Sequence, residues 1–248
     1  MRPAVLLVAG LDPSGGAGLA ADLEALAAVG ARGWPVAAAL TAQGPGGARA
    51  FEPVRPAWLA AQLDALLGGR GRRDPRPGAV KTGMLGSAAN AAVLAERLSR
   101  APLAGLPLVV DPVLAASSGL PLLRGDPRRA LAPLLAAAAV VTPNLAELEA
   151  LTGRPVAGDD AAVEAARSLP CRAVLVKGGH RRGEPVDLLV RGREVLRFPG
   201  RRRPGTARGT GCRLASALAG LLARGEPLPD AVRGAKRVVE RYLDAARR

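Results

Sequence analysis

Aromatic residues are scarce in this sequence of 248 residues, since Phe, Trp and Tyr together make up only 2% of it. A wide groove of aromatic rings, on which the bases of a single-stranded nucleic acid could stack, is therefore not expected. The hydrophobic content is nevertheless 49%, which is enough for a chain of this length to bury a full core of Ala, Leu and Val. We expect a single domain spanning residues 1–248.

Histidine and cysteine are also nearly absent. One histidine, His180, and two cysteines, Cys171 and Cys212, are too few for a zinc site. We expect no secretory leader, because Asp12 interrupts the apolar start after a few residues. The longest apolar stretch is too short to span a bilayer, and the two cysteines are far apart in sequence. These absences favour a reduced, cytoplasmic environment and no contact with a membrane.

Lysine is rare among the basic residues. Lys81, Lys177 and Lys236 are the only lysines among 35 basic residues, and the formal net charge is +14. Arg, Ala, Gly and Pro all have GC-rich codons, so a GC-rich genome explains this composition. The alternative explanation is a basic surface for polyanions. We favour the first explanation and do not expect a nucleic-acid partner.

Short runs of Val and Leu alternate with longer segments of helical periodicity. The first three pairs are Val5–Ala9 with Leu19–Val29, Val36–Leu40 with Ala57–Leu67, and Ala79–Lys81 with Ala88–Leu98. Further runs are Leu108–Asp111, Val140–Thr142 and Ala173–Lys177, and the last two helices are expected at Gly211–Ala223 and Asp230–Ala246. This rhythm predicts an α/β fold with a mostly parallel sheet covered on both faces.

An antiparallel hairpin is expected at the edge of this sheet. Val186–Val190 and Val195–Phe198 flank the short turn Arg191–Arg193. Ligands of such sheets gather at the carboxyl ends of the parallel strands. Polar and glycine-rich segments follow six expected strands: Gly10–Gly18, Thr41–Gln43, Lys81–Met84, Asp111–Val113, Thr142–Asn144 and Lys177–His180. We therefore expect these segments to form one site.

A glycine-rich turn, Arg208–Arg213, opens directly into the apolar run Leu214–Leu222. Such a turn places free backbone N–H groups at a helix N-terminus, which is an anion site built from main chain. The helix dipole and the nearby arginines favour a thiolate at Cys212 or a bound phosphate. Phosphoryl transfer is the chemistry that this segment suggests.

Three places in the sequence have both a structural and a ligand-binding interpretation. Asp12–Gly18 lacks the lysine of a P-loop, so it is either a tight turn or a place where small residues let a substrate ring approach, with Asp22 facing the same cavity. Gln43 is either an ordinary loop residue or a donor and acceptor for a heterocycle with an amino group beside a ring nitrogen. Met84 is either a gap-filler in the core or an apolar wall under a flat ligand.

Asn144, Glu147 and Lys177 also have both a structural and a functional interpretation. Asn144 and Glu147 could hold Mg²⁺ through its waters, or they could form a capping box at the start of a helix. Asp111, at a strand end, could supply a second acidic contact to the metal. Lys177 could neutralise phosphate oxygens, with the following glycines leaving room for a nucleotide, or it could be a snorkelling surface lysine.

These motifs, in this order and spacing, resemble those of the hydroxymethylpyrimidine/phosphomethylpyrimidine kinases of thiamine biosynthesis, within the ribokinase-like superfamily. The resemblance covers nearly the whole chain, and its segments are Ala9–Gly18 with Ala21–Asp22, Ala39–Gln43, Lys81–Leu85, Val110–Val113, Thr142–Glu147, Val176–His180 and Gly209–Cys212. It implies a three-layer α/β/α sandwich that uses ATP and Mg²⁺. It also implies two successive phosphorylations, starting at the hydroxymethyl group of 4-amino-5-hydroxymethyl-2-methylpyrimidine, and a homodimer by analogy.

The resemblance also implies roles for individual residues. Gln43 would pair with the pyrimidine, surrounded by Gly10, Ala17, Gly18, Asp22, Met84 and Val113. Asn144 and Glu147 match the metal motif, with Asp111 beside them, and the nucleotide would contact Lys177, Thr210 and Asn144. Gly209, Gly211 and Cys212 would form the anion hole, where most sugar kinases of the superfamily carry an aspartate base in place of Cys212. A cysteine base would need a lowered pKa.

Three positions depart from the family pattern. Arg208 stands where histidine is usual, Arg213 where threonine is usual, and Ser117 where many members have lysine. The two extra cations could tighten phosphate binding beside the anion hole or partly offset the missing lysine. Two alternatives to a pyrimidine kinase therefore stay open: a pyridoxal or pyridoxine kinase, and a catalytically weak, pyrimidine-sensing regulatory domain.

Overall fold

The computed structural model describes residues 2–68, 76–179, 184–202 and 207–246. The strands are β1 (Ala4–Leu11), β2 (Arg32–Gly44), β3 (Gly47–Pro53), β4 (Pro77–Thr82), β5 (Gly86–Ser87), β6 (Leu108–Val110), β7 (Leu123–Arg124), β8 (Val140–Val141), β9 (Val174–Val176), β10 (Val186–Arg191) and β11 (Glu194–Pro199). The helices are α1 (Gly18–Ala28), α2 (Pro56–Leu67), α3 (Ala88–Leu98), α4 (Pro127–Ala137), α5 (Leu145–Thr152), α6 (Asp159–Arg167), α7 (Thr210–Ala223) and α8 (Leu228–Ala245).

Nine strands form one sheet in the order β11-β10-β9-β8-β6-β4-β1-β2-β3, and β5 pairs with β7 separately. The six central strands are parallel, and the β10–β11 hairpin is antiparallel at one edge. Both features confirm the expectation from the sequence. The other edge is also antiparallel, because β3 folds back onto β2. This second hairpin was not expected, since the exposed edge strand β3 carries small and charged residues and no apolar run.

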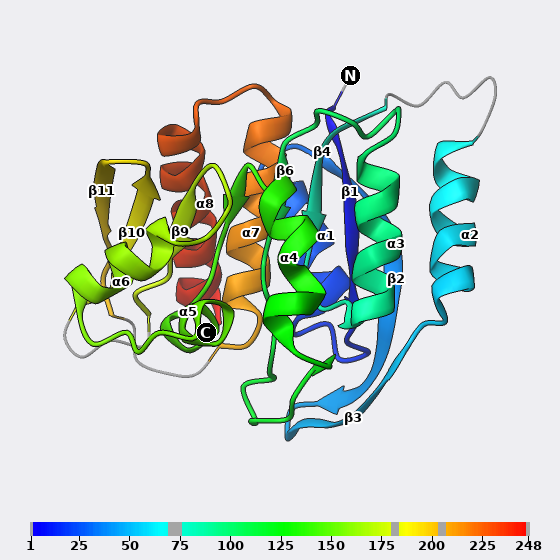
Figure 1. Ribbon diagram of the computed structural model, residues 1–248, viewed down its shortest axis with the longest axis horizontal. Helices are drawn as coiled ribbons and strands as arrows, with labels where there is room; N and C mark the ends of the chain where they lie inside the picture. The colour runs from blue at the N-terminus through cyan, green and yellow to red at the C-terminus, as the bar shows by residue number, and fades with distance from the viewer. Residues whose placement is uncertain (1, 69–75, 180–183, 203–206, 247–248) are drawn as a thin grey trace.

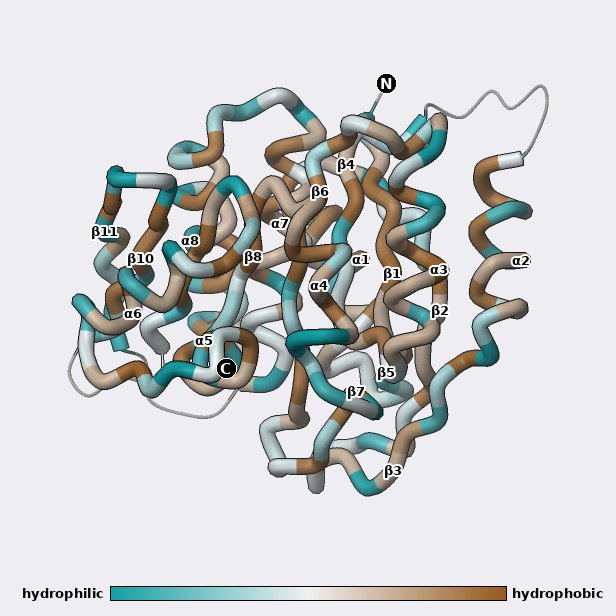
Figure 2. The backbone as a smooth tube through the Cα atoms, viewed as in Figure 1, coloured by the Kyte–Doolittle hydropathy of each residue, from teal (hydrophilic) through white to brown (hydrophobic). Residues whose placement is uncertain are grey.

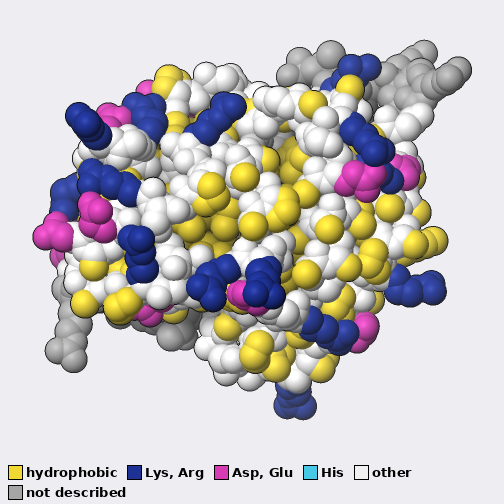
Figure 3. All heavy atoms as spheres, in the orientation of Figure 1, with side chains coloured by type: hydrophobic (Ala, Val, Ile, Leu, Met, Phe, Trp, Pro, Cys, Tyr) yellow, Lys and Arg dark blue, Asp and Glu magenta, His cyan; other side chains and the backbone are white. Residues whose placement is uncertain are grey.

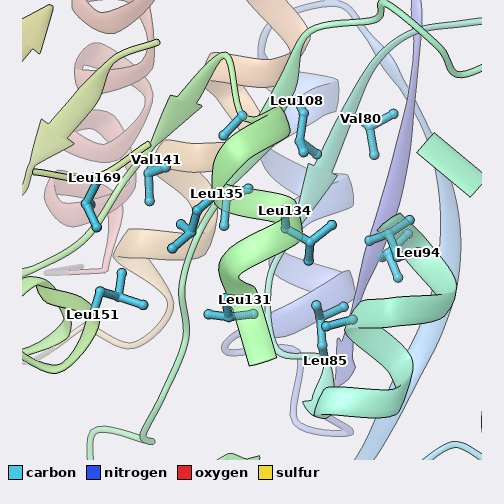
Figure 4. Close-up of a cluster of buried hydrophobic side chains, with 14 of the residues drawn as sticks. Val80, Leu85, Leu94, Leu108, Leu131, Leu134, Leu135, Val141, Leu151 and Leu169 are labelled. Carbon is cyan, nitrogen blue, oxygen red and sulfur yellow. The ribbon is translucent and has the colours of Figure 1, made fainter. Parts of the chain in front are cut away.

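Helices cover both faces of the sheet, so the fold is a three-layer α/β/α sandwich (Figure 1). Alternate residues of β1 divide between the two layers: Leu6 and Val8 pack in the core shared with α2 to α6, and Val5 and Leu7 pack in the core shared with α1, α7 and α8. The apolar segments follow the strands and the inner faces of the helices (Figure 2). Leu131, Leu134 and Leu135 of α4 lie in one cluster with Leu94 of α3 and with Leu108 and Val141 of the sheet (Figure 4). This burial on both faces explains why the parallel strands are apolar throughout.

Basic side chains are spread over the surface. On the face shown in Figure 3 they stand in separate groups, several of them beside Asp or Glu. Arg97 with Asp64, Arg124 with Glu52, and Arg191 with Glu194 are such pairs. This dispersed pattern supports the compositional explanation of the charge. Within the described residues, no helix is both long enough and apolar enough to cross a membrane.

Candidate active site

A cavity of about 280 Å³ lies at the carboxyl ends of the parallel strands. This volume suits a single-ring molecule with a charged group attached. Apart from Asp22, all the site residues expected from the sequence line it: Gly10, Ala17, Gly18, Gln43, Met84, Asp111, Val113, Asn144, Glu147, Lys177, Gly209, Thr210, Gly211 and Cys212. His180 lies outside the described residues. The six strand ends therefore meet at one site, as expected.

One end of the cavity is neutral and largely apolar. Met84 packs with Ala39 and Leu122 in a small cluster of its own, and Val113 packs against this cluster. A Cβ at Gly10 would lie 2.8 Å from the Met84 Sδ, so glycine at this position lets the thioether lie against the backbone. Met84 is only 6% exposed. The core and ligand-wall interpretations of Met84 therefore both apply.

Gln43 is the polar group at this end. A bulge between Ala42 and Gln43 shifts the pairing of β2 with β3 at this residue, and such bulges re-aim side chains beside active sites. Gln43 lines the cavity and is half-buried. Among the described residues, its side-chain amide has no hydrogen-bond partner. The amide can therefore offer one donor and one acceptor to a ligand.

The loop between β1 and α1 closes one side of the cavity. Gly18 has φ +59°, and a Cβ there would lie 2.2 Å from the Gly10 carbonyl oxygen, so glycine is required at this turn. Asp12 holds the loop by accepting from the N–H groups of Ser14 at 2.9 Å and Ala17 at 3.0 Å. The loop is thus a tight turn that brings small residues to the cavity, without a phosphate-binding lysine.

The other end of the cavity contains the N-terminus of α7. Gly209 is the N-cap with φ +69°, and no side chain caps the helix. A Cβ at Gly209 would lie 2.2 Å from the Gly16 carbonyl oxygen, so only glycine allows this approach of two loops. The N–H groups of the first turn, from Thr210 to Cys212, have no acceptor within the helix. Together with the helix dipole they form the expected anion hole.

Lys177 lies beside this anion hole with two carboxylates. Its Nζ is 2.9 Å from Asp111 Oδ1 and 3.5 Å from Glu147 Oε2. Burial alone would lower the pKa of Lys177, but both carboxylates raise it and the net shift is upward. Lys177 is therefore a fixed cation, and its side chain is only 14% exposed. The snorkelling interpretation is wrong, because Lys177 turns into the cavity.

Asn144 and Glu147 form the capping box that the sequence allows. The Asn144 Oδ1 accepts from the Glu147 N–H, and the Glu147 Oε2 accepts from the Asn144 N–H, each at 2.8 Å. Burial raises the pKa of Glu147, Lys177 opposes this shift, and Asp111 adds to it. Both residues also line the cavity. The capping box is therefore formed, and it uses only one oxygen of the Glu147 carboxylate. The other oxygen, Oε1, is left for another partner.

The acidic residues fit a divalent cation held mainly through water and phosphate. Asp111 and Glu147 share the single ammonium of Lys177, so one negative charge is left uncompensated in this part of the cavity. Among the described residues, no cluster of three or more His, Cys, Asp or Glu side chains could hold a metal alone. One or two carboxylates with substrate phosphates and water are the usual environment of Mg²⁺.

Cys212 differs from the expectation of a favoured thiolate. Burial raises the pKa of this thiol to about 11. The Lys81 ammonium counteracts part of the shift, whereas the carboxylates of Asp22 and Asp111 add to it. The cavity therefore holds Cys212 as a neutral thiol at neutral pH. The expected lowering by arginines is absent because neither arginine of this segment contacts the sulfur.

Asp22 was expected to face the cavity, and this expectation is wrong, because Asp22 is not among the residues that line it. Its side chain is fully buried, and both carboxylate oxygens accept from the Lys81 Nζ at 2.8 Å. The Ser216 hydroxyl donates to the same carboxylate at 2.8 Å. Lys81 itself lines the cavity, as expected for the segment Lys81–Met84, but the sequence analysis assigned this lysine no role. A lysine inside an apolar strand of a lysine-poor chain was the signal that could have identified its buried partner.

Arg208 and Arg213 are not free cations at the anion hole. Arg208 lines the cavity, but its Nη2 contacts Asp12 at 2.6 Å and its Nη1 contacts the Gly44 carbonyl at 2.6 Å. The Arg213 guanidinium turns away from the cavity, pairs with Glu24 and lies 3.6 Å from the centre of the Tyr242 ring. Ser117 lines the cavity. Arg213 therefore cannot replace a missing phosphate-binding lysine.

Comparison with known proteins gives a consistent result. The family model described as phosphomethylpyrimidine kinase matches residues 12–248. A hydroxymethylpyrimidine/phosphomethylpyrimidine kinase of Rhizobium meliloti is 43% identical over 100% of this chain and 93% of its own length. The crystal structure of a phosphomethylpyrimidine kinase from Clostridium difficile has a TM-score of 0.81 and 32% identity, covering 100% of both chains. A pyridoxal kinase from Staphylococcus aureus, in complex with AMP-PCP, has a TM-score of 0.83 and 27% identity, covering 95% of this chain and 86% of its own.

Proposed function

Because this chain belongs to the phosphomethylpyrimidine kinase family, we propose that it phosphorylates hydroxymethylpyrimidine and then its monophosphate, with ATP as the phosphoryl donor, in thiamine biosynthesis. The observation that carries this proposal is the cavity itself. It joins a neutral end with one free amide, at Gln43, to an anion hole flanked by Lys177. The ribokinase-like fold and the kinase activity class agree with this arrangement.

The neutral end would hold the aminopyrimidine. The Gln43 amide can accept from the exocyclic amino group and donate to the adjacent ring nitrogen. Met84 and Val113 provide apolar contacts for the ring, while Gly10, Ala17 and Gly18 leave it room. This orientation directs the hydroxymethyl group towards the anion hole, where the reaction takes place.

The charged end would hold the transferring phosphoryl group. The hydroxymethyl oxygen forms a bond to the terminal phosphorus, and the bond from that phosphorus to the leaving ADP oxygen breaks. Negative charge on the phosphoryl oxygens would be stabilised by Lys177 and by the backbone N–H groups of Gly209–Cys212. Asn144, Lys177 and Thr210 are the proposed contacts of the nucleotide.

Cys212 would receive the hydroxyl proton in the first transfer. It can do so only as a thiolate, which burial makes a minor form at neutral pH. In the second transfer the nucleophile is a phosphate oxygen that is already anionic, so no base is needed. The two steps should therefore depend differently on Cys212.

Asp111 and Glu147 would hold Mg²⁺, with Asn144 next to them. When bound, the metal would neutralise charge on the nucleotide phosphates and orient them. Lys177, which contacts both carboxylates, keeps them in place and compensates one of their two charges.

The decisive experiment measures ADP release by the purified protein with Mg-ATP and one of three acceptors. Hydroxymethylpyrimidine and its monophosphate should both be turned over, with little activity on pyridoxal. Preference for pyridoxal would favour the activity named for the Staphylococcus aureus structure. Binding of a pyrimidine without any ADP release would instead support a regulatory domain.

A further inference from the structure

Lys177, Gly178 and Gly179 follow β9 and are called the lysine loop here. Lys177 and Gly179 line the cavity, whereas Gly178 is buried behind them. The Gly178 N–H donates to the Asp187 Oδ1 at 2.7 Å. A Cβ on Gly178 would lie 2.0 Å from the Val186 carbonyl oxygen, so the loop runs directly against the start of β10. Asp187 therefore holds the lysine loop from the side opposite to the cavity.

Asp187 is held in turn by a lysine from a distant part of the chain. The Lys236 Nζ, on α8, lies 2.5 Å from the second oxygen, Asp187 Oδ2. The two side chains are only 14% and 11% exposed. A carboxylate buried to this extent needs a compensating charge. Lys236 supplies it, so the contact between Asp187 and Gly178 depends on α8.

The same helix also holds the anion-hole segment. The Tyr242 hydroxyl, six residues after Lys236 on α8, donates to the Arg208 carbonyl at 3.1 Å, next to the N-cap of α7. The Arg213 guanidinium stacks on the Tyr242 ring. α8 packs along α7 (Figure 1), and none of its described residues lines the cavity. One helix outside the site thus bonds directly to the anion-hole segment and, through Asp187, to the lysine loop.

We propose that Asp187 and Lys236 are positioning residues for phosphoryl transfer, a role that rests on the proposed function. Through Gly178 they set the distance between the lysine loop and the N-terminus of α7. Two glycines give this loop little stiffness of its own. Without the Asp187 contact, the Lys177 N–H would still donate to the Pro143 carbonyl at 2.8 Å and its ammonium would still contact Asp111 and Glu147, but the Gly178 N–H would lose its acceptor. The nucleotide phosphates would then meet a displaced ammonium.

The test uses Asp187→Asn and Lys236→Met in the full-length chain. An asparagine can satisfy either Gly178 or Lys236 with its one acceptor oxygen, but not both. We expect kcat/KM for Mg-ATP to fall by about 10- to 100-fold in each variant, because a small displacement of a catalytic group has a large effect on rate. The Kd of hydroxymethylpyrimidine, measured calorimetrically without nucleotide, should stay within about twofold of the original value.

A direct readout is the hydrogen exchange of the Gly178 amide, which should become faster in both variants. Lys236→Arg, which keeps the positive charge, should restore most of the lost kcat/KM. Arg97→Met is the control for the loss of an ion pair elsewhere, because it removes the exposed pair with Asp64 between α2 and α3, away from the cavity. It should lower Tm without changing kcat/KM or the exchange of Gly178.

The proposal is overturned if Asp187→Asn and Lys236→Met behave like Arg97→Met, with a lower Tm alone. It is equally overturned if pyrimidine affinity falls as far as kcat/KM for Mg-ATP. Failure of the unaltered protein to phosphorylate either pyrimidine would contradict the proposed function instead. In that case the Kd of AMP-PCP and the exchange of Gly178 still decide whether Asp187 positions the loop.

Discussion

The two ends of the cavity offer different kinds of contact. The lining contributed by Met84, Val113 and Gln43 is neutral, with the Gln43 amide as its free polar group. At the other end, Lys177 shares its charge between two carboxylates beside the open N-terminus of α7. In the proposed function, recognition and chemistry are therefore separated along one cavity. Shape and a pair of hydrogen bonds would select the acceptor, and fixed charges would stabilise the transferring phosphoryl group.

The strongest test of this separation is Lys177→Met. It removes the ammonium facing the phosphates and leaves Asp111 and Glu147 without their common partner. We expect kcat to fall by about 10³-fold, within the range known for losing one transition-state contact. Steady-state kinetics with Mg-ATP measure this loss, and calorimetry measures pyrimidine binding. A parallel loss of pyrimidine affinity would show that the two ends are not independent.

The next largest effect is expected for Cys212→Ser. The first phosphorylation should slow by about 10²-fold, because a general base typically contributes at least this much. The second should slow much less, because its nucleophile is already charged. Separate assays with hydroxymethylpyrimidine and its monophosphate measure the two steps. Equal losses would mean that Cys212 positions or binds the anion and does not take a proton.

Gln43→Ala should affect the recognition end alone. Losing two hydrogen bonds to a buried heterocycle should lower kcat/KM for the pyrimidine by about 30-fold. KM for Mg-ATP should hardly change. Gln62→Ala is the matched control, because the Gln62 side chain bonds the backbone of Ala37 and does not line the cavity. A rise in KM for Mg-ATP in Gln43→Ala would contradict the separation.

The last prediction concerns the pH dependence of the first phosphorylation. Since the pKa of Cys212 is raised to about 11, its thiolate fraction grows as pH rises from 7 to 10. If Cys212 is the base, the first phosphorylation should accelerate by up to about tenfold per pH unit over this range. The second should show no such rise, and neither should Cys212→Ser in the first step. A flat profile for the unaltered protein would exclude the base role.

Much of this fold is predictable from the sequence because local signals and core patterning agree. The boundaries expected for the helix Ala88–Leu98 are the observed ones, since Ser87 caps it by accepting from the Asn90 N–H. The site residues at the strand ends are also predictable, because parallel strands bring their carboxyl ends to one edge. In contrast, β3 has no apolar run that could have revealed it.

The directions of the charged side chains could not be predicted in the same way. Arg213 turns away from the anion hole because Glu24, 189 positions earlier, and the Tyr242 ring hold it. The Cys212 pKa likewise depends on burial and on groups from three other segments of the chain. Such contacts join residues that are distant in sequence, so neither spacing nor periodicity contains them.

The buried ion pair beneath the cavity has a consequence for how this chain can vary. Lys81 and Asp22 have no exposed surface, and each is the main charge partner of the other. Losing one alone would leave a bare charge in the core, at a cost of about 3–5 kcal/mol. Natural variation at these two positions is therefore expected to be correlated, because a substitution at one is tolerated only when the other changes with it.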